Sequence, residues 1–214
     1  MLAPCLIQGR REAGCDEAGR GPLAGPVVAA AVMLPHDYTN SLLNDSKQLS
    51  ERQRNTLRTE IEREASAWAV ATVSAGEIDR LNILHASTHA MCLAVKALLG
   101  EPSPDVICRK NDPDAGTPEF LLIDGNRFYN ETAIPYQCIV KGDAKLMPIA
   151  AASILAKTYR DQLMETLHTE YPFYGWDRNK GYPTAEHYEA IERHGVTPYH
   201  RHSFTLYKQH TLFE

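Results

Sequence analysis

Two strand-like segments near the start of the chain are separated by too few residues for a helix to connect them. The first is REAGCDEAG at residues 11–19, and the second is the apolar run GPVVAAAVML at residues 25–34. Glycine and proline punctuate the turn between them, as they do between short strands. Because parallel neighbours need a crossover of a dozen or more residues, this pair predicts an antiparallel ladder.

The rest of the chain alternates between strand and helix patterns. A strand pattern covers residues 66–74, and two short strand candidates, 105–108 and 120–124, flank the polar segment 109–119. That segment is rich in turn formers, so we expect a surface loop. We count residues 133–140 as the fifth strand.

Helix signals appear between and after these strands. Ser50 with Gln53 and Ser74 with Glu77 have the spacing of capping boxes. Further helices are indicated at residues 84–99, from Pro148 onward, and from a Thr184 cap to Gly195. The pattern as a whole predicts an α/β fold: a mixed five-stranded sheet flanked by helices, followed by a C-terminal helical part.

Length and composition indicate what class of protein the chain forms. With 214 residues, 43% of them hydrophobic and 23% charged, we expect one globular domain. Within it we expect a sheet-and-helix core at about 14–170, a C-terminal helical part at about 171–207 and a tail at 208–214. The net charge of -5 does not indicate nucleic-acid binding, but a site holding several carboxylates lowers this sum by itself.

The cysteine pattern and the apolar runs bear on the compartment. The five cysteines have no C-x-x-C spacing, which favours free thiols over disulfides or a zinc ribbon. The longest apolar run, residues 27–34, is too short to span a membrane, and the N-terminus lacks the pattern of a signal peptide. We therefore expect a cytoplasmic protein with no membrane partner, and a monomer.

Four acidic residues stand out by their positions. Asp16 and Glu17 end the first strand, Asp124 closes FLLID, and Asp143 follows the fifth strand in KGDAK. A carboxylate at a buried strand end loses hydration, which a divalent cation can compensate. Two such ions about 3.5–4 Å apart can act on both oxygens of a phosphodiester. Acids beside glycine are also common turn residues, so the pattern alone leaves both interpretations open.

The acid pair raises a geometric difficulty. Neighbouring residues of a strand point to opposite faces. Asp16 and Glu17 can therefore serve one site only if the strand ends or bulges there, which Gly19 and Gly21 make feasible.

Eight sequence blocks carry a resemblance to a known family. They are CDEAGRGPLAGPVVAAAV, LNDSKQLSE, EIDRLNILHAS, LLIDGNRF, IVKGD, AAASILAKTYRD, NKGYPT and HGVTPYHRHSF. In this order the chain resembles bacterial ribonuclease HII from about residue 14 to 204. The resemblance implies a ribonuclease H-like sheet and an endonuclease that cleaves RNA in RNA–DNA hybrids. It also implies cutting 5′ to single ribonucleotides in duplex DNA, leaving 3′-hydroxyl and 5′-phosphate ends, for ribonucleotide removal and RNA primer clearance.

The resemblance also implies roles for the four acids. Asp16, Glu17, Asp124 and Asp143 match the family's catalytic metal-site positions, which hold Mg²⁺ or Mn²⁺, two ions in the active complex.

Substrate-binding residues are implied in the same way. Gly19, Arg20 and Gly21 match the motif that reads the ribose 2′-hydroxyl, and Tyr182 matches the tyrosine beside the RNA–DNA junction. Lys47 matches a residue near the substrate backbone. The chemistry agrees, because glycines allow close backbone approach and the 2′-hydroxyl distinguishes RNA from DNA.

Segment 109–119 interrupts a strand region that is continuous in many relatives. At about 3.3 Å per residue it lies roughly 13 Å back along the strand from Asp124, so we expect it to point away from the metals. Asp112 and Asp114 are then solvated loop residues rather than ligands.

Three other features have competing interpretations. His85 and His89 could bind a metal or form an ordinary helix surface pair. Five basic residues could form a phosphate-facing rim or be solvated charges: Lys141, Lys145, Lys157, Arg160 and Lys180. In the tail, Gln209, Leu212 and Phe213 resemble the short peptide that docks on the bacterial DNA sliding clamp, or form an accidental amphipathic end.

Two rival functions remain open from the residues. A nucleic-acid-binding module without catalysis would not need four strand-end acids. A DNA transposase or resolvase nuclease would not need a reader of the 2′-hydroxyl.

Overall fold

The protein is built on a six-stranded mixed sheet. The computed structural model describes residues 2–43, 48–101 and 103–207. In space the strands run in the order β4-β3-β2-β1-β5-β6. Their bounds are β1 (Glu12–Ala18), β2 (Val27–Met33), β3 (Ala67–Val73), β4 (Val106–Asn111), β5 (Phe120–Asp124) and β6 (Tyr136–Ile139).

Strand direction follows the lengths of the connections. β1 pairs antiparallel with β2, β2 with β3, and β3 with β4, whereas β1–β5 and β5–β6 are parallel. The antiparallel ladder predicted for the first two strands is confirmed.

The sheet has six strands rather than the five predicted, because the two candidates at 105–108 and 120–124 form separate strands, β4 and β5. β4 extends beyond its candidate through Arg109 and Lys110, where the sequence predicts a surface loop. It covers the outer edge of β3, whose backbone groups need partners. Charged residues suit such an edge strand, and Lys110 Nζ donates to the carbonyls of Arg63 and Ala65 at 2.7 and 2.9 Å.

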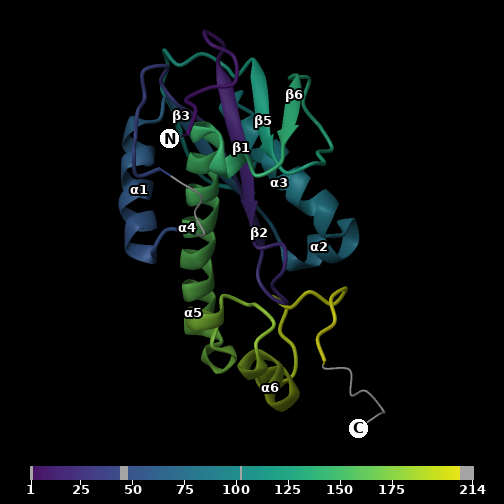
Figure 1. The fold of residues 1–214 in the computed structure, drawn as a ribbon. Coiled ribbons are helices and arrows are strands. Elements are labelled where there is room, and N and C mark those ends of the chain that lie inside the picture. The colour runs from purple at the N-terminus through teal and green to yellow at the C-terminus, as the bar shows by residue number, and fades with distance from the viewer. Residues whose placement is uncertain (1, 44–47, 102, 208–214) are drawn as a thin grey trace.

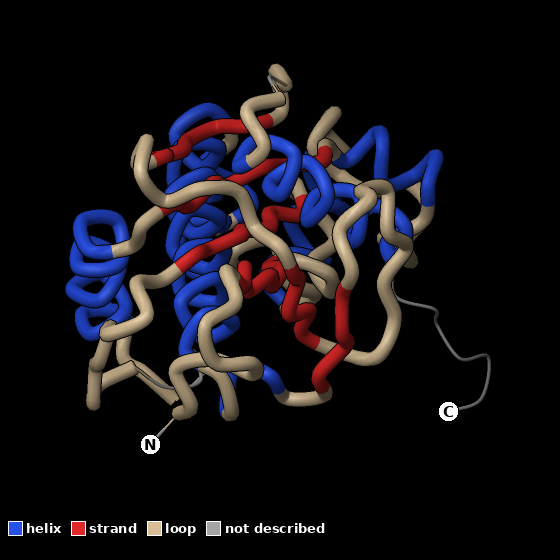
Figure 2. Tube along the Cα trace, turned by 90° about the horizontal axis from the view of Figure 1, so that it is seen from above, coloured by secondary structure: helices blue, strands red, loops and turns tan. Residues whose placement is uncertain are grey.

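Helices cover both faces of the sheet (Figures 1 and 2). α3 (Ile83–Leu98) packs on one face, following the short α2 (Ala75–Leu81). α1 (Glu51–Glu64) and α4 (Met147–Glu170) pack on the other. The remaining helices are the 3₁₀ turns η1 (Gly142–Ala144) and η2 (Pro172–Tyr174), α5 (Trp176–Asn179) and α6 (Ala185–His194).

The predicted caps form. Ser50 with Gln53 and Ser74 with Glu77 make reciprocal capping boxes, and the Thr184 hydroxyl accepts from His187 N–H at the start of α6. These side chains satisfy backbone donors that a helix start leaves unpaired.

The core divides along the pleat of β2, which is buried on both faces. Val27, Ala29 and Ala31 face α3, while Val28 and Ala30 face α1 and α4. Because successive side chains of a strand point to opposite faces, alternate residues of β2 pack against different helical layers.

A C-terminal part packs beneath the sheet, against the lower half of α4 (Figure 1). Its apolar cluster joins the β1–β2 loop to α5 and α6 through Leu23, Ala24, Met164, Trp176 and Ile191.

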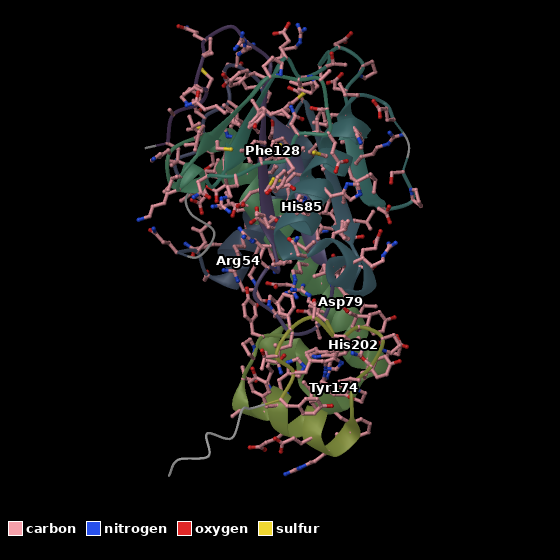
Figure 3. The ribbon with its side chains drawn as sticks, turned by 90° about the vertical axis from the view of Figure 1, so that its right-hand side faces the viewer. Arg54, Asp79, His85, Phe128, Tyr174 and His202 are labelled. Atoms are coloured by element: carbon pink, nitrogen blue, oxygen red, sulfur yellow. The ribbon has the colours of Figure 1, made fainter. Side chains whose placement is uncertain are left out.

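Asp79 in α2 fixes the final segment to the core. Its carboxylate accepts from His202 N at 2.9 Å, Ser203 N at 2.9 Å and Ser203 Oγ at 2.5 Å. Figure 3 labels Asp79 and His202 side by side where the two parts of the molecule meet.

Within the described part of the chain, none of the helices has the length and apolar character needed to cross a membrane.

The close crossing of β1 and α4 makes a direct test of the fold. A Cβ at Gly14 would overlap backbone atoms of Pro148 and Ile149, which cannot move aside like a flexible side chain. We expect Gly14→Ala to lower the free energy of unfolding by about 3 kcal/mol or more in urea titrations. The matched control is Gly76→Ala, where an added Cβ meets nothing within 4 Å. It lies in α2, so alanine should raise stability by up to ~1 kcal/mol. Equal effects of the two substitutions would contradict this packing.

Candidate active site

Three of the predicted acids meet at the carboxyl ends of β1 and β5. Parallel pairing places Cys15 opposite Ile123, so the next residues along the two strands are Asp16 and Asp124. Glu17 follows on β1 just before the strand ends at Ala18. The register of the sheet therefore brings together acids that are far apart in the sequence.

Asp16 and Glu17 share one cleft although strand neighbours diverge. A cleft of about 380 Å³ is lined by Asp16, Glu17 and Asp124. Glu17 and Asp124 also line an adjoining hollow of about 260 Å³ on the side of α3. Asp16 folds back toward its own main chain, with its Oδ1 2.7 Å from Glu17 N. The two acids thus diverge as expected, and the end of the strand lets them meet at one rim.

The carboxylates repel one another. Burial, and then the charges of Glu17 and Asp124, raise the pKa of Asp16 well above its ordinary value, while a hydrogen bond from Ser153 opposes the shift. Burial also raises the pKa of Glu17, and Arg20 opposes that shift with its Nη1 3.2 Å from Glu17 Oε1. The site therefore carries negative charge that its neighbours only partly compensate.

The donor set fits a hydrated divalent cation rather than a closed cage. Among residues 2–43, 48–101 and 103–207, no three acidic, histidine or cysteine side chains form a ready-made metal cluster. Mg²⁺ does not require one, because it keeps several waters and shares substrate phosphates. Asp16, Glu17 and Asp124 offer hard oxygen donors, and a cation would offset both the burial and the repulsion that raise the pKa of Asp16.

The fourth predicted acid is not among the residues that line either hollow. Asp143 is buried in η1. Its neighbour Gly142 contacts the site directly, with its N 2.7 Å from Asp124 Oδ1. A side chain at Gly142 would crowd both that oxygen and Ile149, so the glycine permits η1 to orient Asp124.

The predicted sugar-reading residues lie beside the acids. Gly19, Arg20 and Gly21 line the same cleft as Tyr182. Gly19 adopts φ +95°, and a Cβ there would overlap the Arg160 side chain, so only glycine fits. A Cβ at Gly21 would lie 3.5 Å from the Tyr182 ring, which is 43% exposed. Lys47 lies outside the described residues.

Two buried arginines hold this loop from beneath. Arg160 donates to the carbonyls of Pro26, Ala24 and Lys180 at 3.0–3.2 Å. Arg201 donates to the carbonyls of Gly19, Arg20 and Gly25 at 2.7–3.1 Å. Burial lowers the pKa of Arg160 to about 10 and that of Arg201 to about 9. Neither role was predicted, because carbonyl partners leave no pattern in the sequence.

Two further residues of the cleft were missed. Ser153 from α4 hydrogen-bonds Asp16, and its block AAASILAK is the signal that could have indicated it. Arg54 from α1, labelled in Figure 3, also lines the cleft, and its Nη1 is 2.5 Å from Leu49 O. On a strongly charged helix, nothing in the sequence distinguishes Arg54 from its neighbours.

The five basic residues do not form a single rim. Lys157 lines the cleft and pairs with Asp161 at 2.6 Å. Arg160 is buried, so it is neither a solvated charge nor part of an exposed rim. Lys180 pairs with Glu165 at 2.7 Å, Lys145 donates to a carbonyl of its own turn, and Lys141 starts η1 with φ +55°.

The two helical histidines have separate partners. The His85 ring stacks on Tyr129 with centroids 3.9 Å apart, and His89 Nδ1 lies 2.8 Å from Glu131 Oε1. Within the described ranges they form no metal cluster, which favours the surface-pair interpretation.

The loop that follows β4 points away from the acids, as expected. It is tied to the opposite end of β1, where Arg11 pairs with Glu119 at 2.6 Å. Asp112 and Asp114 are exposed there.

Comparisons with known proteins identify the family of the chain. A family model described as Ribonuclease HII matches residues 13–207. The chain is 57% identical over 206 residues to Ribonuclease HII of Bacteroides thetaiotaomicron, covering 96% of this chain and 95% of that protein. It is 58% identical over 206 residues to Ribonuclease HII of Parabacteroides distasonis, covering 96% of each.

Solved structures share the fold. One belongs to the PCNA:RNase HII complex from Archaeoglobus fulgidus, with a TM-score of 0.71, 24% identity, and coverage of 94% of this chain and 98% of that one. Another is Bst-RNase HIII in complex with Mn²⁺, with a TM-score of 0.70, 19% identity, and coverage of 94% and 69%. With its family model, its close relatives and its ribonuclease H-like sheet, the chain belongs to the ribonuclease HII family and is a type 2 ribonuclease H, an endonuclease.

Proposed function

We propose that this endonuclease uses two divalent ions, Mg²⁺ or Mn²⁺, to cleave the RNA strand of RNA–DNA hybrids and to cut 5′ to single ribonucleotides in duplex DNA. The products carry 3′-hydroxyl and 5′-phosphate ends, and the reaction serves ribonucleotide removal and RNA primer clearance. One observation carries the proposal: three of the four acids, Asp16, Glu17 and Asp124, line a single cleft with the Gly19–Gly21 loop and Tyr182. Hydrolysis and recognition of the sugar can therefore occur side by side.

The acids hold the ions in this scheme. Asp16, Glu17 and Asp124 are the ligands at the cleft, and Asp143 completes the set from η1. When bound, divalent ions supply activation of water and stabilisation of the leaving 3′-oxygen. The chain's own contribution is orientation, because Ser153 and Gly142 N–H each hydrogen-bond one carboxylate.

Recognition rests on the loop and the tyrosine. The 2′-hydroxyl both donates and accepts, so the backbone of Gly19–Gly21 can read it at close range. Arg20, half-exposed beside Glu17, is suited to a substrate phosphate, which positions the strand without reading its sequence. The exposed Tyr182 ring offers an apolar face to the adjacent sugar. Lys47 is proposed to contact the backbone nearby.

The proposal also covers the cellular location and the oligomeric state of the enzyme. We place the enzyme in the cytoplasm, supported by the free thiols of Cys5, Cys15, Cys92 and Cys138, and take a monomer as the default.

One assay separates this function from a DNA nuclease and from a binding module. A duplex with one ribonucleotide and an all-DNA duplex are incubated with and without Mg²⁺ or Mn²⁺. We expect cleavage only 5′ to the ribonucleotide and only with metal.

Asp124→Asn should lower cleavage more than about 100-fold while leaving hybrid affinity nearly unchanged, because it removes a ligand rather than a phosphate contact. The control Asp112→Asn, in the distant loop, should cleave normally. Normal turnover by Asp124→Asn at saturating metal would refute the ligand assignment.

Repulsion among the acids predicts a pH-dependent stability. The folded-state pKa of Asp16 is raised, so ionising it costs stability as the pH rises from about 4 through that pKa. In metal-free protein at pH 7–8, we expect Asp16→Asn to raise the melting temperature, by about 2–4 °C for each ~1 kcal/mol relieved. The gain should disappear near pH 4. Added Mn²⁺ should stabilise the wild type more than the variant in the same thermal scans. A lower melting temperature of the variant at pH 8 would contradict the repulsion.

We also propose that the tail docks on the sliding clamp. Gln209, Leu212 and Phe213 lie outside the described residues, and the fold neighbour from A. fulgidus was solved as a complex with PCNA. Deleting residues 208–214 should weaken binding to purified bacterial clamp by at least about tenfold, or about 1.4 kcal/mol, with cleavage unchanged. Alanine at His210 and Thr211, which the motif leaves variable, should not. Equal clamp binding by the full and shortened chains would remove the proposal.

A further inference from the structure

A chain of hydrogen bonds runs beneath Tyr182, through two buried histidines. Thr197 N lies 2.9 Å from His200 Nδ1, and His200 Nε2 lies 3.2 Å from His187 Nε2. His187 Nδ1 then lies 3.0 Å from the Tyr182 carbonyl oxygen. His187 and His200 are 0% and 1% exposed, so water does not compete for these contacts.

The contacts fix the tautomer of each ring. A backbone N–H can only donate, so His200 Nδ1 accepts from Thr197 and the His200 proton is on Nε2. That proton is donated to His187 Nε2, which also accepts from Trp176 Nε1 at 3.1 Å. The His187 proton is then on Nδ1 and is donated to the Tyr182 carbonyl. Burial lowers the pKa of both rings, that of His200 to about 4, so both are neutral at pH 7.

The far end of this chain is attached to the sugar-reading loop. His200 forms an antiparallel bridge with Ala24. On either side, Gly25 N–H donates to Tyr199 O and Arg201 N–H donates to Leu23 O, both at 2.8 Å. The hydrogen bonds therefore connect the base of the loop to the main chain that carries the Tyr182 ring.

We propose that His187 and His200 are positioning residues that hold Tyr182 at a fixed separation from the Gly19–Gly21 loop. The loop and the ring then contact neighbouring sugars at an RNA–DNA junction together. Arg160 already joins Ala24 and Pro26 to Lys180, and the strut formed by the two histidines adds a second connection that helps make a single embedded ribonucleotide a good substrate. This inference rests on the roles proposed above for the loop and for Tyr182.

The two amides that resemble histidine each break the strut at a different contact. Asparagine at residue 187 places its amide near the position of Nδ1, so His187→Asn keeps the donor to Tyr182 but loses the contacts with His200 and Trp176. Glutamine reaches the position of Nε2 instead, so His187→Gln keeps the partner of Trp176 but loses that donor. Both variants remove a buried ring and should destabilise the fold similarly.

The measured quantity is junction preference: kcat/KM on a duplex with one ribonucleotide divided by kcat/KM on a uniform RNA–DNA hybrid. We expect His187→Gln to lower it about 10–100-fold, because a displacement of about 1 Å can have that effect. His187→Asn should lower it similarly, because it breaks the contact with His200, whereas damage to packing alone would lower kcat/KM on both substrates alike and leave the ratio unchanged. The control His194→Gln, an exposed histidine of the same helix, should match the wild type. A wild-type preference in both His187 variants would overturn the proposal.

Tyr182→Ala distinguishes failure of the strut from failure of the proposed function. Tyr182→Ala should lower the preference, and adding His187→Gln should lower it no further, since both act through one ring. If the single Tyr182→Ala variant keeps the wild-type preference, the role of Tyr182 itself is wrong. If Tyr182→Ala lowers the preference and His187→Gln multiplies that loss, the strut is wrong.

The tautomers of His187 and His200 can be tested in the wild-type protein, without an activity assay and without any variant. Nitrogen-15 spectra of the wild-type protein at pH 7 should show the His200 proton on Nε2 and the His187 proton on Nδ1. The opposite tautomer at either ring would overturn the hydrogen-bond chain.

Discussion

Two buried guanidinium groups hold the substrate side of this molecule in place. Arg160 from α4 and Arg201 from the final segment direct their donors at main-chain carbonyls of residues 19–26 and at Lys180. A buried cation is costly unless its donors are satisfied, and a planar guanidinium with five donors can satisfy several carbonyls at once. Because Arg160 occupies the space where a side chain of Gly19 would lie, the shape of the loop and the burial of the arginine depend on each other.

This arrangement sets opposite charges around one cleft. Ionising Asp16 is opposed by burial, Glu17 and Asp124. Cations line the same cleft: the exposed Arg20 pairs with Glu17, and the half-buried Lys157 pairs with Asp161. A low-dielectric cleft strengthens both fields, so a phosphate and a divalent cation are complementary to it together. The loop proposed to read the sugar lines this same cleft, so the proposed recognition and cleavage take place side by side.

The sequence predicted well wherever the signal is local. Capping boxes at Ser50 and Ser74 formed because they involve residues three apart on one helix. The antiparallel start of the sheet followed from a short connection. The candidate at 105–108 proved longer than predicted, because the polar end of an edge strand, here Arg109 and Lys110, has the composition of a loop. The burial of Arg160 was missed because its partners are carbonyls, which every residue has.

By itself the sequence determined the strand-end acids, the glycines of the loop and the family, since these depend on residue type and order along the chain. Only the tertiary structure decided that Asp16 and Glu17 can serve one cleft, because this depends on where β1 ends against β5. It also decided that Arg160, Arg201 and the pair His187 and His200 support the loop and Tyr182. Those contacts join residues up to 182 positions apart, and their geometry exists only once the chain has packed.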